Sequence, residues 1–345
     1  MGLVYDKDGN AIGEEPDFIP GPSPLSDFMG SNVDDATLGW FEAEVEEPAE
    51  PVRRSKLRDP EATAAMPTFR TLSLSDLDNL PEPEWIIDGF VPADAMVTVF
   101  GAPGSTKSFW ALAVACSIAS GHKFNGADVK IGKVIYCVGE GLRGMKWRIE
   151  AWLLANPEAD KESLYKNLII LPRAVMLLDK TEAAMLTNTA EDLHDLDESL
   201  PLRAFVIDTW ARSLTGGDEN SAQDVGIAIN VCETVRAKTG ASPIIIHHTG
   251  ADGTRERGST ALRGATDTTI QMSHDEAAGI VTVTCKKMKD GEPFAPGKFT
   301  LKPFGHSIVL SPSDATHTSF GSYTPQTRDK DYWRKQAEEK RNNPF

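Results

Sequence analysis

The fold of this chain is decided by the stretch Met96-Val97-Thr98-Val99-Phe100-Gly101-Ala102-Pro103-Gly104-Ser105-Thr106-Lys107-Ser108. Its first five residues are mostly apolar or β-branched and predict a strand. Two glycines follow in a loop, and Lys107-Ser108 then opens an apolar run that predicts a helix. In this layout backbone N–H groups at a helix N-terminus surround phosphate oxygens, the lysine supplies charge and the serine hydroxyl reaches Mg²⁺. The stretch therefore predicts a phosphate-binding loop.

The loop departs at one position from the phosphate-loop consensus G-x-x-x-x-G-K-[ST]. Thr106 stands where the consensus has its second glycine. The alternative to a phosphate loop is an ordinary strand-to-helix turn that carries Lys-Ser by chance. On the first interpretation, the residues that surround the phosphate chain are Gly101, Ala102, Pro103, Gly104, Ser105, Thr106, Lys107, Ser108 and Phe109.

Polar residues lie within two positions of the ends of three further apolar runs. These are Lys133–Val138, followed by Glu140; Phe205–Ile207, followed by Asp208; and Pro243–Ile246, followed by His247 and His248. Strands that alternate with helical patterns predict a mainly parallel sheet with helices on both faces. Ligands bind at the carboxyl edge of such sheets. Four elements that bring polar groups to one edge favour the phosphate loop over a chance turn.

The strand-end side chains suit distinct chemical tasks. Asp208 can hold Mg²⁺ through a water or together with Ser108. Glu140, between two glycines, can orient or deprotonate an attacking water. His248 can hydrogen-bond a terminal phosphate and report its loss. Taken one at a time, each also has a structural explanation: a capping aspartate, a solvent-facing glutamate, or a core or loop histidine.

Polar segments flank the predicted core. The chain carries a net charge of −16, and its first 51 residues hold 13 acidic residues against one basic residue. Since most of the charge lies there, it does not argue against a nucleic-acid partner. We predict a mostly disordered acidic arm over 1–66, an α/β domain over 67–311 and a polar tail over 312–345.

The end of the predicted domain has a different pattern from its beginning. Three short runs with turn residues between them predict antiparallel strands: Thr268–Met272, Ile280–Thr284 and Lys298–Leu301. The fold class is thus α/β, with a mainly parallel central sheet and antiparallel strands at its C-terminal side.

The cysteines and the apolar segments indicate where in the cell the protein is expected. The four cysteines lie far apart, without a C-x-x-C pair: Cys116, Cys137, Cys232 and Cys285. This spacing predicts reduced core residues and argues against disulfides or a zinc site. The sequence shows no signal peptide and no long apolar span, so we expect a cytoplasmic protein without a membrane partner.

The order of the motifs resembles a known superfamily. GAPGSTKS, VGEG, FVIDT, HHTG and RGST follow one another as in RecA-type ATPase cores, and the chain is most similar to the RepA-like hexameric replicative helicases of plasmids and phages. The resemblance spans Leu74 to Leu310. It implies a RecA-like fold, ATP and Mg²⁺ as cofactors, and a site that contains Lys107, Ser108, Glu140, Asp208 and His248.

The resemblance also implies a cation that a neighbouring subunit supplies to the ATP site. Asp267 occupies the position expected for the helicase arginine, and Arg263 lies four residues earlier. RecA-type proteins instead use a K-x-K or K-x-R pair at a strand end, which Lys287 and Lys289 match. The alternative for that pair is a solvated hairpin end.

The expected partners are single-stranded DNA and further copies of the chain, in a ring that the resemblance implies to be a hexamer. Two glycine loops are candidates for DNA contact, Leu214–Gln223 and Gly250–Ser259. Because the first is acidic, we expect the main phosphate contacts from Arg255 and Arg257 in the second. A flexible, solvated loop of mixed charge is the alternative.

Two other functions fit the same motifs. One is a recombination or repair ATPase that forms filaments on DNA without unwinding it. The other is a regulatory ATP-binding protein with no motor activity, whose acidic arm recruits a partner. Leu38, Trp40 and Phe41 are the candidate docking residues for a partner of the arm, and the alternative is a solvated tail.

Overall fold

The computed structural model describes residues 3–5, 11–14, 73–74, 76, 83–250 and 255–313. The chain divides into two compact units, Met1–Asp78 and Asn79–Phe345. In the first unit, β1 (Leu3–Tyr5) and β2 (Ala11–Glu14) pair antiparallel, a small hairpin that the sequence does not predict.

Several predictions on the flanking segments lie outside the described residues. They concern most of the acidic arm, its candidate docking residues Leu38, Trp40 and Phe41, and the tail from residue 314 onward. The predicted boundaries at 66/67 and 311/312 stay predictions.

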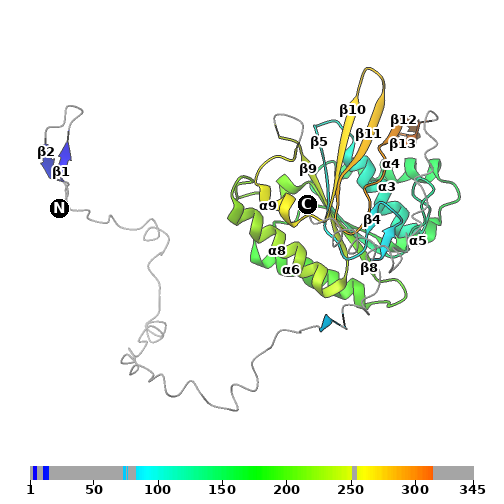
Figure 1. Ribbon diagram of the computed structural model, residues 1–345, viewed down its shortest axis with the longest axis horizontal. Coiled ribbons are helices and arrows are strands. Elements are labelled where there is room, and N and C mark those ends of the chain that lie inside the picture. The colour runs from blue at the N-terminus through cyan, green and yellow to red at the C-terminus, as the bar shows by residue number, and fades with distance from the viewer. Residues whose placement is uncertain are drawn as a thin grey trace, which may run out of the picture. The chain divides into compact units, whose positions relative to one another are not determined.

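The second unit is built on one nine-stranded sheet (Figure 1). Its strands, from one edge to the other, are β13 (Ser307–Pro312), β12 (Gly297–Phe304), β11 (Ile280–Met288), β10 (Thr268–Asp275), β5 (Val97–Gly101), β9 (Ser242–His248), β8 (Leu202–Asp208), β6 (Lys133–Val138) and β7 (Leu168–Leu171). Neighbours from β10 to β7 run parallel, and β10 to β13 pair antiparallel. The predicted fold class is confirmed.

Helices cover both faces of the parallel strands. They are α3 (Lys107–Ser120), α4 (Leu142–Ala155), α5 (Lys161–Asn167), α6 (Lys180–Asp195), α7 (Trp210–Ser213), α8 (Ala222–Thr239) and α9 (Thr260–Ala265). One face packs against α3, α4 and α5, and the other against α6, α8 and α9. Figure 1 shows α6 and α8 lying along the same side of the sheet.

Alternation along the strands explains the two apolar layers. In β6, Val134, Tyr136 and Val138 join the layer on the α3 side, whereas Ile135 and Cys137 join the layer on the α6 and α8 side. Successive side chains of a strand point to opposite faces. A strand buried on both faces must therefore be apolar throughout, as these runs are.

Some elements differ from the sequence prediction. The sequence predicts that Glu182–Leu200 is helical in part, and the helix found there, α6, starts earlier, at Lys180, and ends at Asp195. The short helix α5 and the edge strand β13 were not predicted, because α5 has only 7 residues and β13 is half-buried, with polar residues at both ends. The four cysteines are free and buried, as predicted. Among the described residues, no helix combines the length and apolarity needed to cross a bilayer.

Candidate functional site

The predicted polar residues do meet at the carboxyl edge of the parallel strands. Strand register places Gly101, the last residue of β5, beside His248 of β9. Asp208, the last residue of β8, lies beside Val138 of β6, two residues before Glu140. One edge thus carries the loop and the three strand-end residues, as the sequence predicts.

The ammonium group of Lys107 folds back over the phosphate loop. Its Nζ donates hydrogen bonds to the carbonyl oxygens of Gly101 and Ala102, both at 2.9 Å, and to Ser105 Oγ at 3.3 Å. Burial lowers the pKa of Lys107 to about 8, against the opposing effect of the Asp208 charge. A phosphate oxygen is a stronger partner for an ammonium than neutral carbonyl groups are, so this lysine is placed to bind one.

Thr106 explains why the consensus has a glycine at its position. Its backbone is left-handed, with φ at 65° and ψ at 21°, and it is the residue immediately before α3. This region of φ/ψ space disfavours side chains with a Cβ, most of all β-branched ones. The Thr106 hydroxyl donates to the carbonyl oxygen of Ser105 at 2.7 Å. The loop keeps the consensus geometry without the consensus residue.

Ser108 and Asp208 form a set of oxygen ligands suited to Mg²⁺. Ser108 Oγ donates to Asp208 Oδ1 at 3.0 Å, although the two residues are 100 positions apart. Asp208 is buried, which raises its pKa, while hydrogen bonds from Tyr136 and Ser108 lower it. Hard hydroxyl and carboxylate oxygens are what Mg²⁺ binds beside nucleotide phosphates. These residues therefore fit the ion that the phosphate loop implies.

Glu140 is exposed and held by an arginine that the sequence does not single out. Arg212 Nε donates to Glu140 Oε1 at 2.7 Å, and both side chains are more than half exposed. Arg212 lies in α7, between Asp208 and the first candidate DNA loop. At Gly139 a Cβ would lie 2.7 Å from the carbonyl oxygen of Asp208, so only glycine allows this close approach of β6 to β8.

A second unpredicted arginine, Arg148 of α4, lies near the loop. Its guanidinium stacks over the ring of Phe109 at 4.8 Å, and its charge acts on Asp208. Phe109, which we predict as part of the phosphate site, contacts this arginine, and its role at the site stays a prediction. No sequence signal identifies Arg148, because it lies inside a helix, α4. The N-terminus of this helix lies near the phosphate loop only because of the order of strands in the sheet.

The two histidines differ in their environment. His247 is buried, and its Nε2 lies 2.8 Å from the carbonyl oxygen of Arg257. His248 is partly exposed, and burial followed by the charge of Lys107 lowers its pKa. A neutral imidazole near the Lys107 ammonium can hydrogen-bond a phosphate oxygen, so His248 is the better placed of the pair, and its role there stays a prediction.

Comparison with known proteins identifies the class of this site. The AAA domain family matches residues 61–254, more than half of the chain. The chain belongs to this family. No curated protein matches it. The match includes the phosphate loop, Glu140, Asp208 and His248, and P-loop ATPase domains of this kind bind ATP with Mg²⁺.

The second candidate DNA loop of this AAA domain is tied to the first. Arg257 Nε donates to Glu219 Oε2 at 2.7 Å, and its backbone N–H donates to the carbonyl oxygen of His248 at 3.0 Å. Ser259 N also donates to the carbonyl oxygen of Glu219. Residues 251–254 of the second loop are outside the part of the chain that the structure describes. Arg255 and Arg257, with Arg263, line a hollow beside α9.

The cations predicted to act on a neighbouring subunit of the ATPase are held within their own chain. Lys287 Nζ donates to the carbonyl oxygens of Arg263 and Thr266, at the end of α9. Lys289 Nζ lies 3.3 Å from Asp267 Oδ1 and is largely exposed. Arg263 forms an ion pair with Glu256 at 2.7 Å. Lys289 is thus the most readily redirected of the three.

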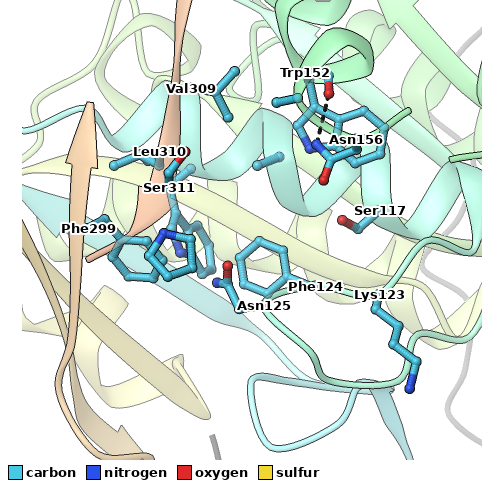
Figure 2. A pocket seen from close by; sticks show the side chains of 14 residues that line it. Ser117, Lys123, Phe124, Asn125, Trp152, Asn156, Phe299, Val309, Leu310 and Ser311 are labelled. Carbon is cyan, nitrogen blue, oxygen red and sulfur yellow. Dashed lines mark hydrogen bonds between the residues drawn. The ribbon is translucent and has the colours of Figure 1, made fainter. Parts of the chain in front are cut away.

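A separate pocket of about 160 Å³ lies beside the far half of α3 in the ATPase domain. Figure 2 shows Phe299 and Ser311 on one side of it and Trp152 and Asn156 on the other. Ser117 also lines it, nine residues after Ser108, or roughly 13 Å along the helix axis. The pocket is therefore distinct from the nucleotide edge.

Proposed function

We propose that this ATPase is a ring-forming motor, a RepA-like replicative helicase that translocates on single-stranded DNA. The observation that carries the proposal is a continuous set of contacts from the nucleotide edge to the two candidate DNA loops. Glu140 contacts Arg212, α7 leads from Arg212 into the first loop, and Glu219 of that loop contacts Arg257.

Hydrolysis follows from the placement of the residues at the edge. The loop N–H groups and Lys107 bind the phosphate chain, and Ser108 and Asp208 would hold Mg²⁺, which would supply positive charge beside the phosphate oxygens. Glu140 accepts the proton of the attacking water, for which its carboxylate must first leave Arg212. His248 bonds the terminal phosphate and loses that partner after cleavage.

Coupling to DNA uses the contacts between the loops. A DNA phosphate that binds Arg257 competes with Glu219 for the same guanidinium. Because Arg257 N donates to the His248 carbonyl, a shift of Arg257 is passed to the residue beside the terminal phosphate. Such contacts to phosphate are independent of sequence and weaken with salt.

The homo-oligomer completes the site. The nucleotide edge of one chain contains Lys107 and Arg148, and a further cation from a neighbour would stabilise charge on the departing phosphate. Lys287, Lys289 and Arg263 remain the candidates, with Lys289 the most exposed in its ion pair. We further propose that the acidic arm docks a replication protein.

The test measures the unwinding of duplex DNA and the mass of the protein assembly. The full-length protein is incubated with a forked duplex and ATP, and its mass is measured by light scattering with nucleotide and DNA. The proposal predicts strand separation by a closed oligomer of about six chains, lost in Lys107→Ala.

Other outcomes of the same test contradict the motor. Filaments on DNA without strand separation would indicate a recombination-type ATPase. ATP hydrolysis by a monomer that ignores DNA would indicate a regulatory ATPase.

A further inference from the structure

Tyr136 lies in the middle of β6 and is fully buried in the apolar layer under α3. Its neighbours on the same face of the strand, Val134 and Val138, are aliphatic. A buried hydroxyl in such a layer destabilises the fold unless it has a hydrogen-bond partner. The partner of this hydroxyl therefore shows what it does.

The hydroxyl of Tyr136 points to the metal-binding carboxylate. It donates to Asp208 Oδ2 at 2.8 Å and lies 3.3 Å from the carbonyl oxygen of Ser108. A phenol has one proton to donate, and an ionised carboxylate is the stronger acceptor. The shorter contact is thus the principal one.

Asp208 is held at both of its oxygens by donors from different elements. Ser108 Oγ, at the start of α3, bonds Oδ1, and Tyr136, from β6, bonds Oδ2. A carboxylate bonded at both oxygens cannot rotate about its terminal torsion without losing one of these bonds. A Ser108 hydroxyl that ligates the ion through an oxygen lone pair keeps its proton for Asp208, so the bonds from Ser108 and from Tyr136 are both compatible with a bound ion.

We propose that Tyr136 is a positioning residue of the metal site, whose hydroxyl fixes the Asp208 carboxylate in the orientation that binds Mg²⁺. The proposal rests on the ATPase assignment and needs neither DNA nor an oligomer. Partners that orient metal ligands in this way typically affect metal affinity about tenfold or more when removed.

A purely structural hydroxyl makes a different prediction. Removing it would change the stability of the nucleotide-free fold and leave metal affinity as it was. Tyr136→Phe keeps the ring and its packing and removes only the hydroxyl. Tyr165→Phe is the matched control, because Tyr165 lies in α5 and is 63% exposed.

The experiment measures Mn²⁺ binding to the full-length protein with saturating ADP, by electron paramagnetic resonance. Nucleotide affinity in EDTA is measured by calorimetry, and folding by thermal unfolding in EDTA. For Tyr136→Phe we expect the Mn²⁺ dissociation constant to rise about tenfold, with ADP affinity in EDTA within about twofold of wild type. Tyr165→Phe should match wild type in both.

Three results would overturn the proposal. One is unchanged Mn²⁺ affinity in Tyr136→Phe, whatever its stability. Another is an equal loss of ADP affinity in EDTA, which would place the defect in the phosphate loop. The third comes from a second experiment on the wild-type protein.

If Tyr136→Phe does not fold, ¹³Cζ-tyrosine labelling of wild type decides instead. A buried tyrosine signal that moves with Mg²⁺ in the ADP complex supports the proposal, and unmoved signals contradict it. Failure of wild type to bind ADP would contradict the ATPase assignment itself.

Discussion

At the scale of single residues, Thr106 shows how a loop can keep a geometry that its own side chain opposes. The residue is left-handed, at the position where the consensus glycine would adopt the same backbone at little cost. Its Cβ makes this conformation less favourable by about 1 kcal/mol. The surrounding helix and strand must supply that free energy.

Replacing Thr106 with glycine should therefore stabilise the protein. Relief of the strain should raise the free energy of unfolding by about 1 kcal/mol. The greater entropy of glycine in the unfolded chain offsets part of this gain. We therefore expect the unfolding midpoint to rise by about 2 °C. Thr215→Gly, at a position without positive φ, is the control and should lower the midpoint. Calorimetry of the nucleotide-free protein measures both. An equal fall in the two variants would show that Thr106 is not strained.

Some residues of the candidate site could be predicted from the sequence, and others could not. Asp208 and His248 were predictable because each lies within two residues of the end of an apolar run, and strand ends are local features. Tyr136, Arg148 and Arg212 were not, because their partners lie far away in sequence: Arg212 and Glu140 are 72 positions apart. Such contacts depend on the order of strands in the sheet, which no local pattern contains.

Among the elements, α7 joins the nucleotide edge to the first candidate DNA loop. Its four residues stand between the strand end at Asp208 and the polar loop that reaches Glu219. The pair of Arg212 with Glu140 is exposed, and exposed ion pairs contribute at most about 1 kcal/mol. A small movement of α7 is therefore enough to release Glu140.

Arg212→Ala should raise ATP hydrolysis in the absence of DNA. Without the arginine, the Glu140 carboxylate is free to meet the attacking water, so we expect a severalfold higher basal rate and a smaller response to DNA. Arg173→Ala, which breaks an exposed pair with Glu182 of similar length, is the control and should match wild type. A phosphate-release assay reports both rates. A lower basal rate in Arg212→Ala would mean that the arginine assists catalysis.

At the scale of the whole molecule, the sheet order explains why the motifs form one site. β9 lies between β5 and β8, and β6 follows β8, so motifs far apart in the chain meet at adjacent strand ends. The alternation of strands and helices was enough to predict that edge. Which of Lys287, Lys289 and Arg263 would act on a neighbouring chain, as we propose, stays open, because each of the three is bonded within its own chain.

We propose that nucleotide hydrolysis at this edge responds to DNA at the loops. The most direct measurement is the steady-state ATPase rate of the full-length protein with and without single-stranded DNA, at two salt concentrations. The account predicts a severalfold stimulation by DNA that falls as salt rises, with neither rate measurable in Lys107→Ala. An ATPase rate that is unchanged by single-stranded DNA at low salt would contradict it.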